Sequence, residues 1–481
     1  MLRLYNTLTR NVADFVPLRN GEVRMYVCGL TPSAEPHLGH ARSFLFFDVL
    51  RAYLTHLGYR VTYVQNVTDI DDRSIEAARE EGRPWNEVVQ RYYASFKNSM
   101  RTLGVAEPDI EPRATAYVPQ IVAMIDQLVQ AGHAYVGEDG VYFRVSTFSA
   151  YGKLSGKQTD ELLIGARIAE NEKKLDPLDF ALWKFAKPGE PSWPSPWGPG
   201  RPGWHIECSA MAHELLGEPF DIHGGGTDLI FPHHENEIAQ TESLLPQPPM
   251  ANFWIHGGML NFEQRKMSKS LGNYEPLFEL LERSDPQAIR LLFLQTGYRK
   301  PMNFTEESLA AATTALGKLR KAFRTLSGGT APAQSDADFD RIIERVEAAL
   351  DDDMNTSAAL AVLFDVASKA DTYAAADSAK AAARAFAYAL DLLRIVPNES
   401  WLQEKQVDVE IVAARLRERL GEVAVLAGDG NGTIAAVVAA RDQARKSKDF
   451  ALADRLREAL AAEQIELHDT RDGTTWTLAG G

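Results

Sequence analysis

The chain has 481 residues, a formal net charge of −15 and 45% hydrophobic residues. This length predicts about three domains, and the composition is typical of a folded globular protein. The negative charge argues against non-specific nucleic-acid binding, which depends on neutralising phosphates. Only two cysteines in so long a chain argue against a disulfide-stapled secreted fold. Because the start of the chain lacks the apolar core of a signal peptide, and no apolar run could span a bilayer, we expect a cytoplasmic protein without a membrane segment.

The first part of the chain alternates between strand and helix patterns. We expect a buried strand over residues 23–28, a helix over 38–57 that Gly58 ends, a strand over 60–67 and a helix from 70 to 82. This alternation predicts an α/β fold with a doubly wound parallel sheet of the Rossmann type.

The composition then changes several times along the chain. A strand over 141–145 and a stretch rich in Pro, Gly and Trp over 188–202 indicate an insertion, after which the sheet pattern resumes from Trp204 through 253–256. Beyond Asn303 the chain turns alanine-rich and helical. The predicted segments are the first half of the Rossmann domain (1–115), a connective insertion (116–200), the second half (201–256), a domain carrying a lysine-rich loop (257–325), a helical bundle (336–396) and a small C-terminal domain (400–481).

Two histidines lie at the expected start of the first helix, in the motif His37-Leu38-Gly39-His40. The free N–H groups and the dipole of a helix N-terminus attract anions. Gly39 lets a ligand approach the backbone closely, and imidazole N–H groups can hold phosphate oxygens as negative charge develops. The motif therefore indicates an ATP-phosphate site, although such a pair is also met by chance at helix starts.

A lysine-rich segment, Lys266-Met267-Ser268-Lys269-Ser270, lies far downstream. Lysine acts as a point charge on phosphate, so a mobile loop of this composition can close on a triphosphate. The alternative is a solvated charged turn. Together with the histidine motif, the segment predicts the second half of one ATP site.

Both cysteines lie in motif context, and Cys208 is accompanied downstream by His233 and Glu237, whereas Cys28 lies far upstream. A helix over residues 233–237 would place His233 and Glu237 on one face. Thiolate, imidazole and carboxylate are all zinc ligands, whereas the alternative for a buried cysteine is a small apolar filler. We favour a zinc site, with His223 and His234 as outer or substrate-contacting groups. The candidate ligands are Cys28, Cys208, His233 and Glu237.

Two further patterns are more ambiguous. The acids from Asp69 to Asp72 could bind a metal, but helix capping is the favoured interpretation, and Thr68 lies where open α/β sheets bind ligands. Arg299-Lys300 and the strip from Arg441 to Lys448 are local basic sites that could hold a specific RNA. Solvated helix faces or loops are the alternative for both.

Several motifs together carry a specific resemblance that runs through nearly the whole chain. They are residues 25–29 (MYVCG), 37–42 (HLGHAR), 66–72 (NVTDIDD), 204–211 (WHIECSAM), 220–240 (FDIHGGGTDLIFPHHENEIAQ), 266–273 (KMSKSLGN), 351–358 (DDDMNTSA) and 448–457 (KDFALADRLR). On these residues the sequence resembles the class I aminoacyl-tRNA synthetases, and among them the cysteinyl-tRNA synthetase family.

The resemblance implies a reaction. Cysteine and Mg-ATP would react to cysteinyl-adenylate and pyrophosphate, and the terminal ribose hydroxyl of the cysteine tRNA would then attack the adenylate. The bundle would bind the tRNA, the C-terminal domain would read its anticodon, and the protein would be a monomer.

The resemblance also implies roles for single residues. It implies one zinc ion per chain, held by the four candidate ligands. The other implied sites are a cysteine site with Gly29, Thr68 and Trp204, an ATP site with His37, Gly39, His40 and Lys269, and catalytic groups His37, His40, Lys266 and Lys269.

The implied zinc offers a physical account of how the protein would select cysteine against serine. A hydrophobic pocket separates near-isosteres by only about 10–200-fold. A soft thiolate binds zinc directly, and the hydroxyl of serine has no comparable tendency to ionise there. We therefore expect no editing domain.

The sequence departs from the family pattern at a few positions, and two other functions compete with the one that the resemblance implies. Leu38 stands where the family usually has isoleucine, and residues 30–36 differ more, so the contacts of that loop are not predicted. One rival is a tRNA-independent ligase that joins cysteine to an amino-sugar by the same adenylate chemistry; Glu237 and the 448–457 segment disfavour it. The other is a non-catalytic, zinc-stabilised RNA-binding protein, which the intact 266–270 segment disfavours.

Overall fold

A computed structural model describes residues 1–157, 173–262, 265–266, 275–328, 337–376, 379–402, 409–421, 429–463, 465–470 and 473–478. The chain divides into two compact units. The first contains Met1–Ala312, Arg341–Val362 and Tyr388–Ile395, and the second contains Thr313–Asp340, Leu363–Ala387 and Val396–Gly481. The bounds of the six predicted segments stay predictions.

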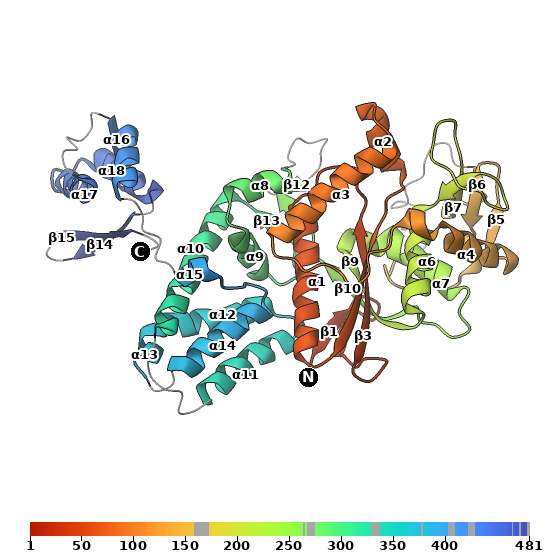
Figure 1. Ribbon diagram of the computed structural model, residues 1–481, viewed down its shortest axis with the longest axis horizontal. Coiled ribbons are helices and arrows are strands. Elements are labelled where there is room, and N and C mark those ends of the chain that lie inside the picture. Colours follow the sequence, from red (N-terminus) through yellow and green to blue (C-terminus); the bar gives the residue numbers. More distant parts are fainter. Residues whose placement is uncertain are drawn as a thin grey trace. The chain divides into compact units, whose positions relative to one another are not determined.

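A four-stranded parallel sheet forms the centre of the first unit (Figure 1). Its order is β10–β9–β3–β4, with β3 at Glu22–Leu30, β4 at Arg60–Val67, β9 at Phe220–Gly226 and β10 at Ala251–Gly257. Because β4 and β9 pair with opposite sides of β3, the strand order reverses there, and ligand crevices open beyond the carboxyl ends of strands at such a point. The predicted doubly wound Rossmann-type fold is confirmed.

The first helix, α1 (Leu38–His56), has buried residues on all sides because it packs between the sheet and other helices. It ends before Gly58, which has φ +89, as predicted. The helix approaches β9 so closely that a Cβ at Gly224 would lie 2.4 Å from the ring of Phe47. Glycine at this position therefore sets how near α1 lies to the sheet.

The acidic cluster after β4 serves the fold. Asp71 caps α2 (Asp72–Glu81) by accepting a hydrogen bond from the backbone N–H of Arg73 at 3.0 Å. Asp69 accepts hydrogen bonds from the backbone N–H and the hydroxyl of Thr115 at 2.9 and 2.7 Å. The capping interpretation is confirmed. Helix α3 (Trp85–Thr102) follows.

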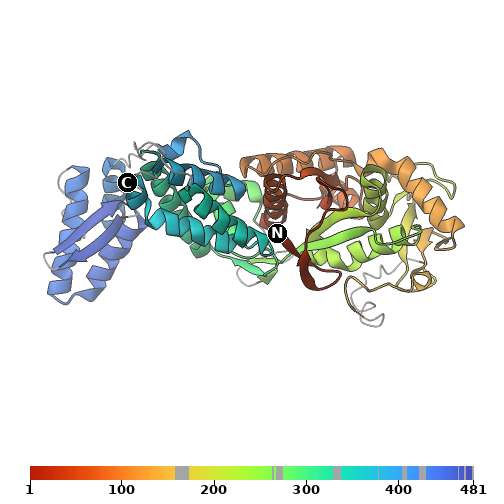
Figure 2. The same ribbon diagram turned by 90° about the horizontal axis from the view of Figure 1, so that it is seen from below.

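An insertion separates the two halves of the parallel sheet, and both views place it to one side of that sheet (Figure 1 and Figure 2). Its described residues form an antiparallel sheet of four strands and the helix α4. Its elements are α4 (Val118–Gln130), β5 (Ala134–Val136), β6 (Gly140–Phe143), β7 (Phe180–Phe185) and β8 (Gly200–Pro202). The strand predicted over 141–145 ends earlier, because Val145 begins a short 3₁₀ turn.

Trp204 begins a helix, α6 (Trp204–Leu216), so the sheet pattern does not resume there as predicted. The helix is buried on most sides. A sequence pattern without a clear period cannot tell a buried helix from a buried strand. The sheet resumes with β9.

Further elements of the first unit lie before residue 305. They are β1 (Arg3–Asn6), β2 (Asn11–Asp14), a π-type turn (Ile230–His234), α7 (Glu235–Glu242), α8 (Leu277–Arg283), α9 (Pro286–Leu294) and a three-stranded sheet in the order β12–β11–β13 from β11 (Leu260–Phe262), β12 (Arg265–Lys266) and β13 (Met302–Phe304).

The alanine-rich part of the chain is helical, as predicted. Its helices are α10 (Glu306–Ser327), α11 (Ala337–Asp351), α12 (Thr356–Ser368), α13 (Ala370–Ala374), α14 (Ala379–Leu392) and α15 (Glu399–Leu402). The end of the described chain forms α16 (Val409–Leu420), α17 (Gly430–Lys446), α18 (Phe450–Ala462), β14 (Ile465–Thr470) and β15 (Gly473–Leu478). These last elements share a hydrophobic core of their own.

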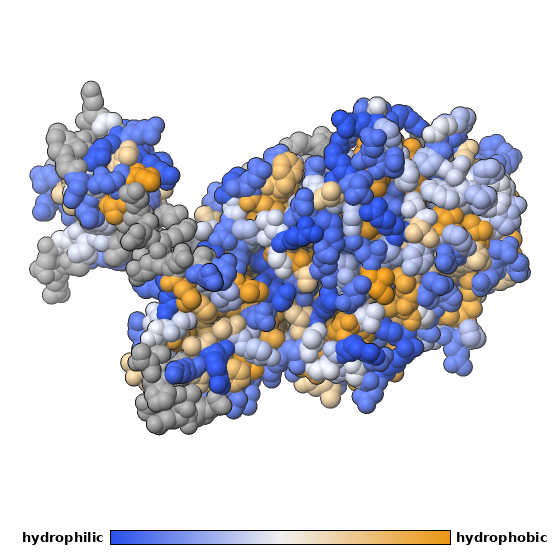
Figure 3. Space-filling view, viewed as in Figure 1, coloured by the Kyte–Doolittle hydropathy of each residue, from blue (hydrophilic) through white to orange (hydrophobic). Residues whose placement is uncertain are grey.

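Among the described residues, no helix combines the length and the apolar character that a membrane crossing requires. On the face shown in Figure 3, hydrophilic residues predominate and apolar residues form separate patches.

Candidate active site

A cavity of about 320 Å³ opens at the carboxyl ends of β3, β9 and β10, where the reversal of strand order predicts a ligand site. Strand ends, the start of α1 and the start of α6 all contribute to its wall. Its lining residues include Cys28, Gly29, His37, Gly39, His40, Arg42 and Trp204.

The two motif histidines cap α1 and stack on each other. His37 Nδ1 accepts a hydrogen bond from the backbone N–H of Gly39 at 3.0 Å, and His40 Nδ1 accepts one from the backbone N–H of His37 at 3.2 Å. Their rings lie 3.9 Å apart with an interplanar angle of 28°. Because each Nδ1 accepts, we assign the proton of each neutral ring to Nε2. Burial lowers the pKa of His37 to about 4 and the pKa of His40 well below its usual value, so both rings are neutral Nε2–H donors at pH 7.

Acid should destabilise the fold through such buried histidines. Burial lowers the pKa of His37 to about 4 and of His256 to about 3, and it also lowers the pKa values of His40, His205 and His234. The unfolded chain, with ordinary histidine pKa values of about 6.5, binds more protons below that pH, so the free energy of unfolding should fall as the pH drops from about 6.5 towards 4. Urea denaturation at about pH 7, 6 and 5 measures this. His256→Asn should make the dependence shallower, and a pH-independent wild type would contradict the argument.

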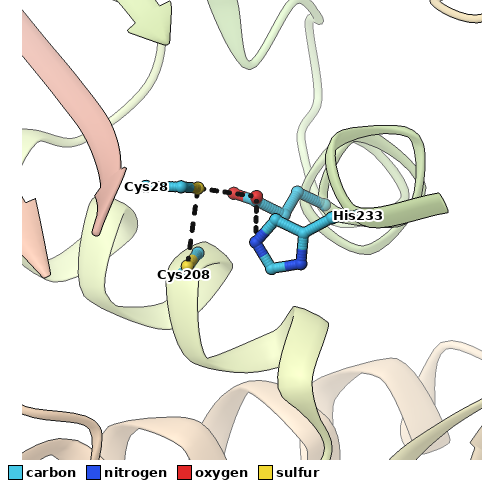
Figure 4. Close-up of side chains that lie close together, drawn as sticks. Cys28, Cys208 and His233 are labelled. Carbon is cyan, nitrogen blue, oxygen red and sulfur yellow. Dashed lines mark hydrogen bonds and ion pairs between the residues drawn. The ribbon is translucent and has the colours of Figure 1, made fainter. Parts of the chain in front are cut away.

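The four predicted metal ligands come together from four elements, and Figure 4 shows Cys28, Cys208 and His233 close to one another. Cys28 lies in β3, Cys208 in α6, His233 in the π-type turn and Glu237 in α7. The two Sγ atoms are 3.8 Å apart, Cys28 Sγ lies 3.4 Å from Glu237 Oε1, and His233 Nε2 lies 3.0 Å from the same oxygen. All four donor atoms lie within 4.8 Å of one another and are buried, so this group fits one metal ion.

A second donor set shares two of these residues. Cys28 and Glu237 also lie close to His223 and His234, with His223 Nε2 2.8 Å from Glu237 Oε2 and His234 Nε2 3.3 Å from Cys28 Sγ. The first set has two sulfurs, which suits zinc. It also borders the cavity, because the ring of its histidine stacks on Trp204 at 4.2 Å. We therefore favour the first set.

The charges of the cluster suit a cation. Burial opposes ionisation of Cys208, but the hydrogen bond from Cys28 and the charge of His233 outweigh it and lower the pKa of Cys208 to about 6. Burial raises the pKa of Cys28. Burial also disfavours the carboxylate of Glu237, but the neighbouring imidazoles hold its pKa well below the usual range. A thiolate and a carboxylate are the deprotonated donors that a metal ion requires.

Two of the three predicted cysteine-binding residues, Gly29 and Trp204, line the cavity, whereas Thr68 does not. The side chain of Asn66 joins Gly29 to Thr68, because its Oδ1 accepts a hydrogen bond from the Gly29 N–H at 2.8 Å and its Nδ2 donates to Thr68 Oγ1 at 3.2 Å. A Cβ at Gly29 would lie 1.6 Å from the carbonyl oxygen of Asn66, so no side chain fits there.

Sequence reasoning missed the groups that contact the candidate ligand His233 and its neighbour His234. His205 Nδ1 lies 2.9 Å from His233 Nδ1. His256 Nε2 lies 2.7 Å from His234 Nδ1, and its own Nδ1 lies 2.8 Å from the hydroxyl of Thr7. Such partners fix the orientation of ligand rings. They come from distant segments, and no spacing in the sequence marks them.

The lysine-rich segment is described only where it begins. Lys266 ends β12 and pairs in register with Asn261 of β11. Lys269 lies outside the described residues. The roles of both lysines stay predictions.

Part of each basic strip is neutralised within the protein. Arg299 pairs with Asp353, and Arg441 and Arg445 both pair with Asp469. These three cations are therefore paired within the protein, which weakens the interpretation of the strips as RNA-binding sites.

The chain matches known families over most of its length. Residues 14–314 match the family model described as "tRNA synthetases class I (C) catalytic domain", and residues 345–396 match the DALR domain. The fold and the site thus define a class I aminoacyl-tRNA synthetase. The chain is 47% identical over 477 residues to the cysteine–tRNA ligase of Alkalilimnicola ehrlichii, covering 99% of each chain, and 44% identical over 488 residues to that of Pseudomonas aeruginosa, covering 100% of each. Within the class, it belongs to the cysteine–tRNA ligase family.

Solved structures share the fold at low identity. The Mycobacterium tuberculosis methionyl-tRNA synthetase bound by methionyl-adenylate matches with a TM-score of 0.58 and 17% identity, over 79% of this chain and 92% of that chain. The leucyl enzyme from Agrobacterium radiobacter K84 matches with a TM-score of 0.56 and 12% identity, over 81% of this chain and 89% of that chain.

Proposed function

We propose that this chain attaches cysteine to the cysteine tRNA in two steps through a cysteinyl-adenylate. The carboxylate of cysteine attacks the α-phosphorus of ATP, and pyrophosphate leaves. The terminal ribose hydroxyl of the tRNA then attacks the carbonyl carbon, and AMP leaves. The single observation that carries the proposal is that one cavity contains both the histidine motif and, through Cys28 and Trp204, the border of the metal-binding cluster.

The first step needs donors for the phosphate oxygens. His37 and His40 present neutral Nε2–H groups at the start of α1, where the helix dipole also attracts anions, and such donors stabilise charge that develops during attack. Lys266 and Lys269 neutralise the leaving pyrophosphate as point charges, and Mg²⁺ accompanies the ATP. Because the histidine rings are neutral donors, they need no proton transfer to act.

Cys28, Cys208, His233 and Glu237 would hold a zinc ion at the edge of the cavity. When bound, zinc supplies a soft Lewis acid that favours a thiolate over a hydroxyl, which selects cysteine against serine. Trp204 forms the adjoining wall, and Asn66 holds Gly29 and Thr68 in place, so the backbone around the amino acid is rigid.

The partners follow from the reaction: ATP, L-cysteine and the cysteine tRNA. We assign tRNA binding to the helices from α10 to α15 and anticodon reading to the elements from α16 to β15. The protein should act as a monomer.

Cysteine-dependent exchange of labelled pyrophosphate into ATP tests the first step. We expect exchange with zinc-loaded protein, and a preference for cysteine over serine above the roughly 200-fold limit of a hydrophobic pocket. Charging of cysteine tRNA, compared with transfer to an amino-sugar acceptor, tests the second step. Absence of exchange in metal-loaded protein would contradict the proposed function.

A further inference from the structure

Arg42 lies in the first turns of α1, and only 5% of it is exposed. Its Nη1 donates hydrogen bonds to the carbonyl oxygens of Gly258 and Met259, both at 2.9 Å. Its Nη2 donates to the carbonyl oxygens of Lys300 at 2.6 Å and Gly297 at 3.5 Å. Four backbone carbonyls thus take up the four hydrogens of the two terminal nitrogens.

These carbonyls belong to two segments that lead into the same small sheet. Residues 258–259 precede β11, and residues 297–300 precede β13. Strand β11 pairs with β13 on one side and with β12, which ends at Lys266, on the other. The two segments are in close contact, since a Cβ at Gly258 would lie 2.6 Å from the carbonyl oxygens of both Arg299 and Lys300. The guanidinium of Arg42 therefore holds the two segments that lead into β11 and β13 against α1.

The histidine motif lies on the same rigid turn. Arg42 follows His40 by two residues, which is about 3 Å along a helix axis. The lysine-rich segment leaves the described sheet at Lys266. Arg42 thus joins the helix that carries one half of the proposed ATP site to the sheet from which the other half departs.

We propose that Arg42 is a positioning residue that holds the β12–β11–β13 sheet, and with it the backbone of Lys266, at a fixed distance from the histidine motif. The inference rests on the proposed function, because it presupposes that both motifs act on one triphosphate. A misplacement of about 1 Å can slow a reaction about 10²-fold, so a group that fixes this distance controls the rate of the first step.

Arg42 also lines the cavity, and burial lowers its pKa to about 10, which leaves it charged at neutral pH. A direct action of this charge on the triphosphate is the competing explanation. The geometry favours positioning, because the terminal N–H groups point to the backbone of the two segments.

Arg42→Lys separates these two explanations, since lysine keeps the charge but lacks the planar fork that reaches both segments. We expect single-turnover formation of cysteinyl-adenylate to slow by about 10²-fold, with little change in ATP affinity. Transfer of cysteine from preformed adenylate to tRNA should stay near the wild-type rate, because pyrophosphate has already left. Arg42→Met should be no slower than Arg42→Lys.

Arg24→Lys is the matched control. Arg24 is also buried, and it donates hydrogen bonds to the carbonyl oxygens of Leu216 at 2.5 Å and Gly217 at 3.2 Å and to that of Pro219. It precedes Cys28 by four residues of β3, about 13 Å along a strand. This variant should lose comparable stability in thermal denaturation, while adenylate formation stays unchanged.

Gly258→Ala disturbs the same junction while the residue at position 42 stays arginine, and it should reproduce the selective loss of adenylate formation. It keeps the test open if the Arg42 variants fail to fold. A wild-type rate in Arg42→Lys would overturn the proposal. So would restoration of the rate by lysine relative to methionine, or an equal loss of both reaction steps. A wild type without pyrophosphate exchange would instead refute the proposed function.

Discussion

Cys208→Ser should lose the bound metal and the activation of cysteine together. The Cys208 thiol has its pKa lowered to about 6 inside a buried cluster, and a serine hydroxyl does not supply a comparable anionic donor. Loss of an outer partner of a metal ligand typically costs 10–100-fold, and loss of a ligand itself should cost more than about 100-fold in pyrophosphate exchange. Elemental analysis of the purified variant, beside the exchange assay, measures both effects.

His213→Ala is the control for Cys208→Ser. His213 lies on the same helix, α6, but it contacts only Glu218 among its described hydrogen-bond partners and is not a candidate ligand. It should keep one metal ion per chain. Comparison of His233→Asn with His223→Asn separates the two donor sets, because only the former should empty the site. Normal metal content in Cys208→Ser would remove that residue from the ligand set.

His37→Asn and His40→Asn should each slow adenylate formation by about 10²–10³-fold, which is the usual cost of losing one donor to a developing anion. Asparagine is also among the best residues at a helix N-cap, so His37→Asn keeps the acceptor for the Gly39 N–H. The stability of α1 should therefore change little. Rapid-quench measurement of adenylate formation, with thermal denaturation alongside, tests both statements.

His56→Asn provides the control at the opposite end of α1. His56 hydrogen bonds with Tyr388 and Glu347 and is remote from the cavity lining. Replacing His56 should leave adenylate formation unchanged.

The rings of His37 and His40 stack at 3.9 Å. In the His37→Asn, His40→Asn double variant, the fold loss in the rate of adenylate formation should therefore be smaller than the product of the two single losses. A full rate in either single variant would make that histidine a structural cap only.

The elements around the parallel sheet could be predicted because their signals are local. The strand predicted over 60–67 coincides with β4, and Gly58 and Gly82 follow the helices that they were expected to end. The sequence predicts that the sheet pattern resumes at Trp204, but Trp204 begins α6. Periodicity could not indicate this helix, because a helix that is buried on most sides has no polar face to mark its period.

The candidate site was predictable only in part, for a physical reason. Cys28 and Cys208 carry their chemistry in their side chains and lie in recognisable motifs. Arg42 and Asn66 act through backbone groups of remote segments, and a carbonyl oxygen has no signature in a sequence. The orientation of His233 by His205 likewise exists only after folding.

The reciprocal hydrogen bonds at the start of α1 have a consequence for engineering. The ring nitrogens that accept these hydrogen bonds belong to the same two imidazoles that line the cavity. The capping of α1 and the proposed rate of turnover therefore depend on the same two side chains, so a design for higher thermal stability should leave His37 and His40 unchanged and modify distant surface positions.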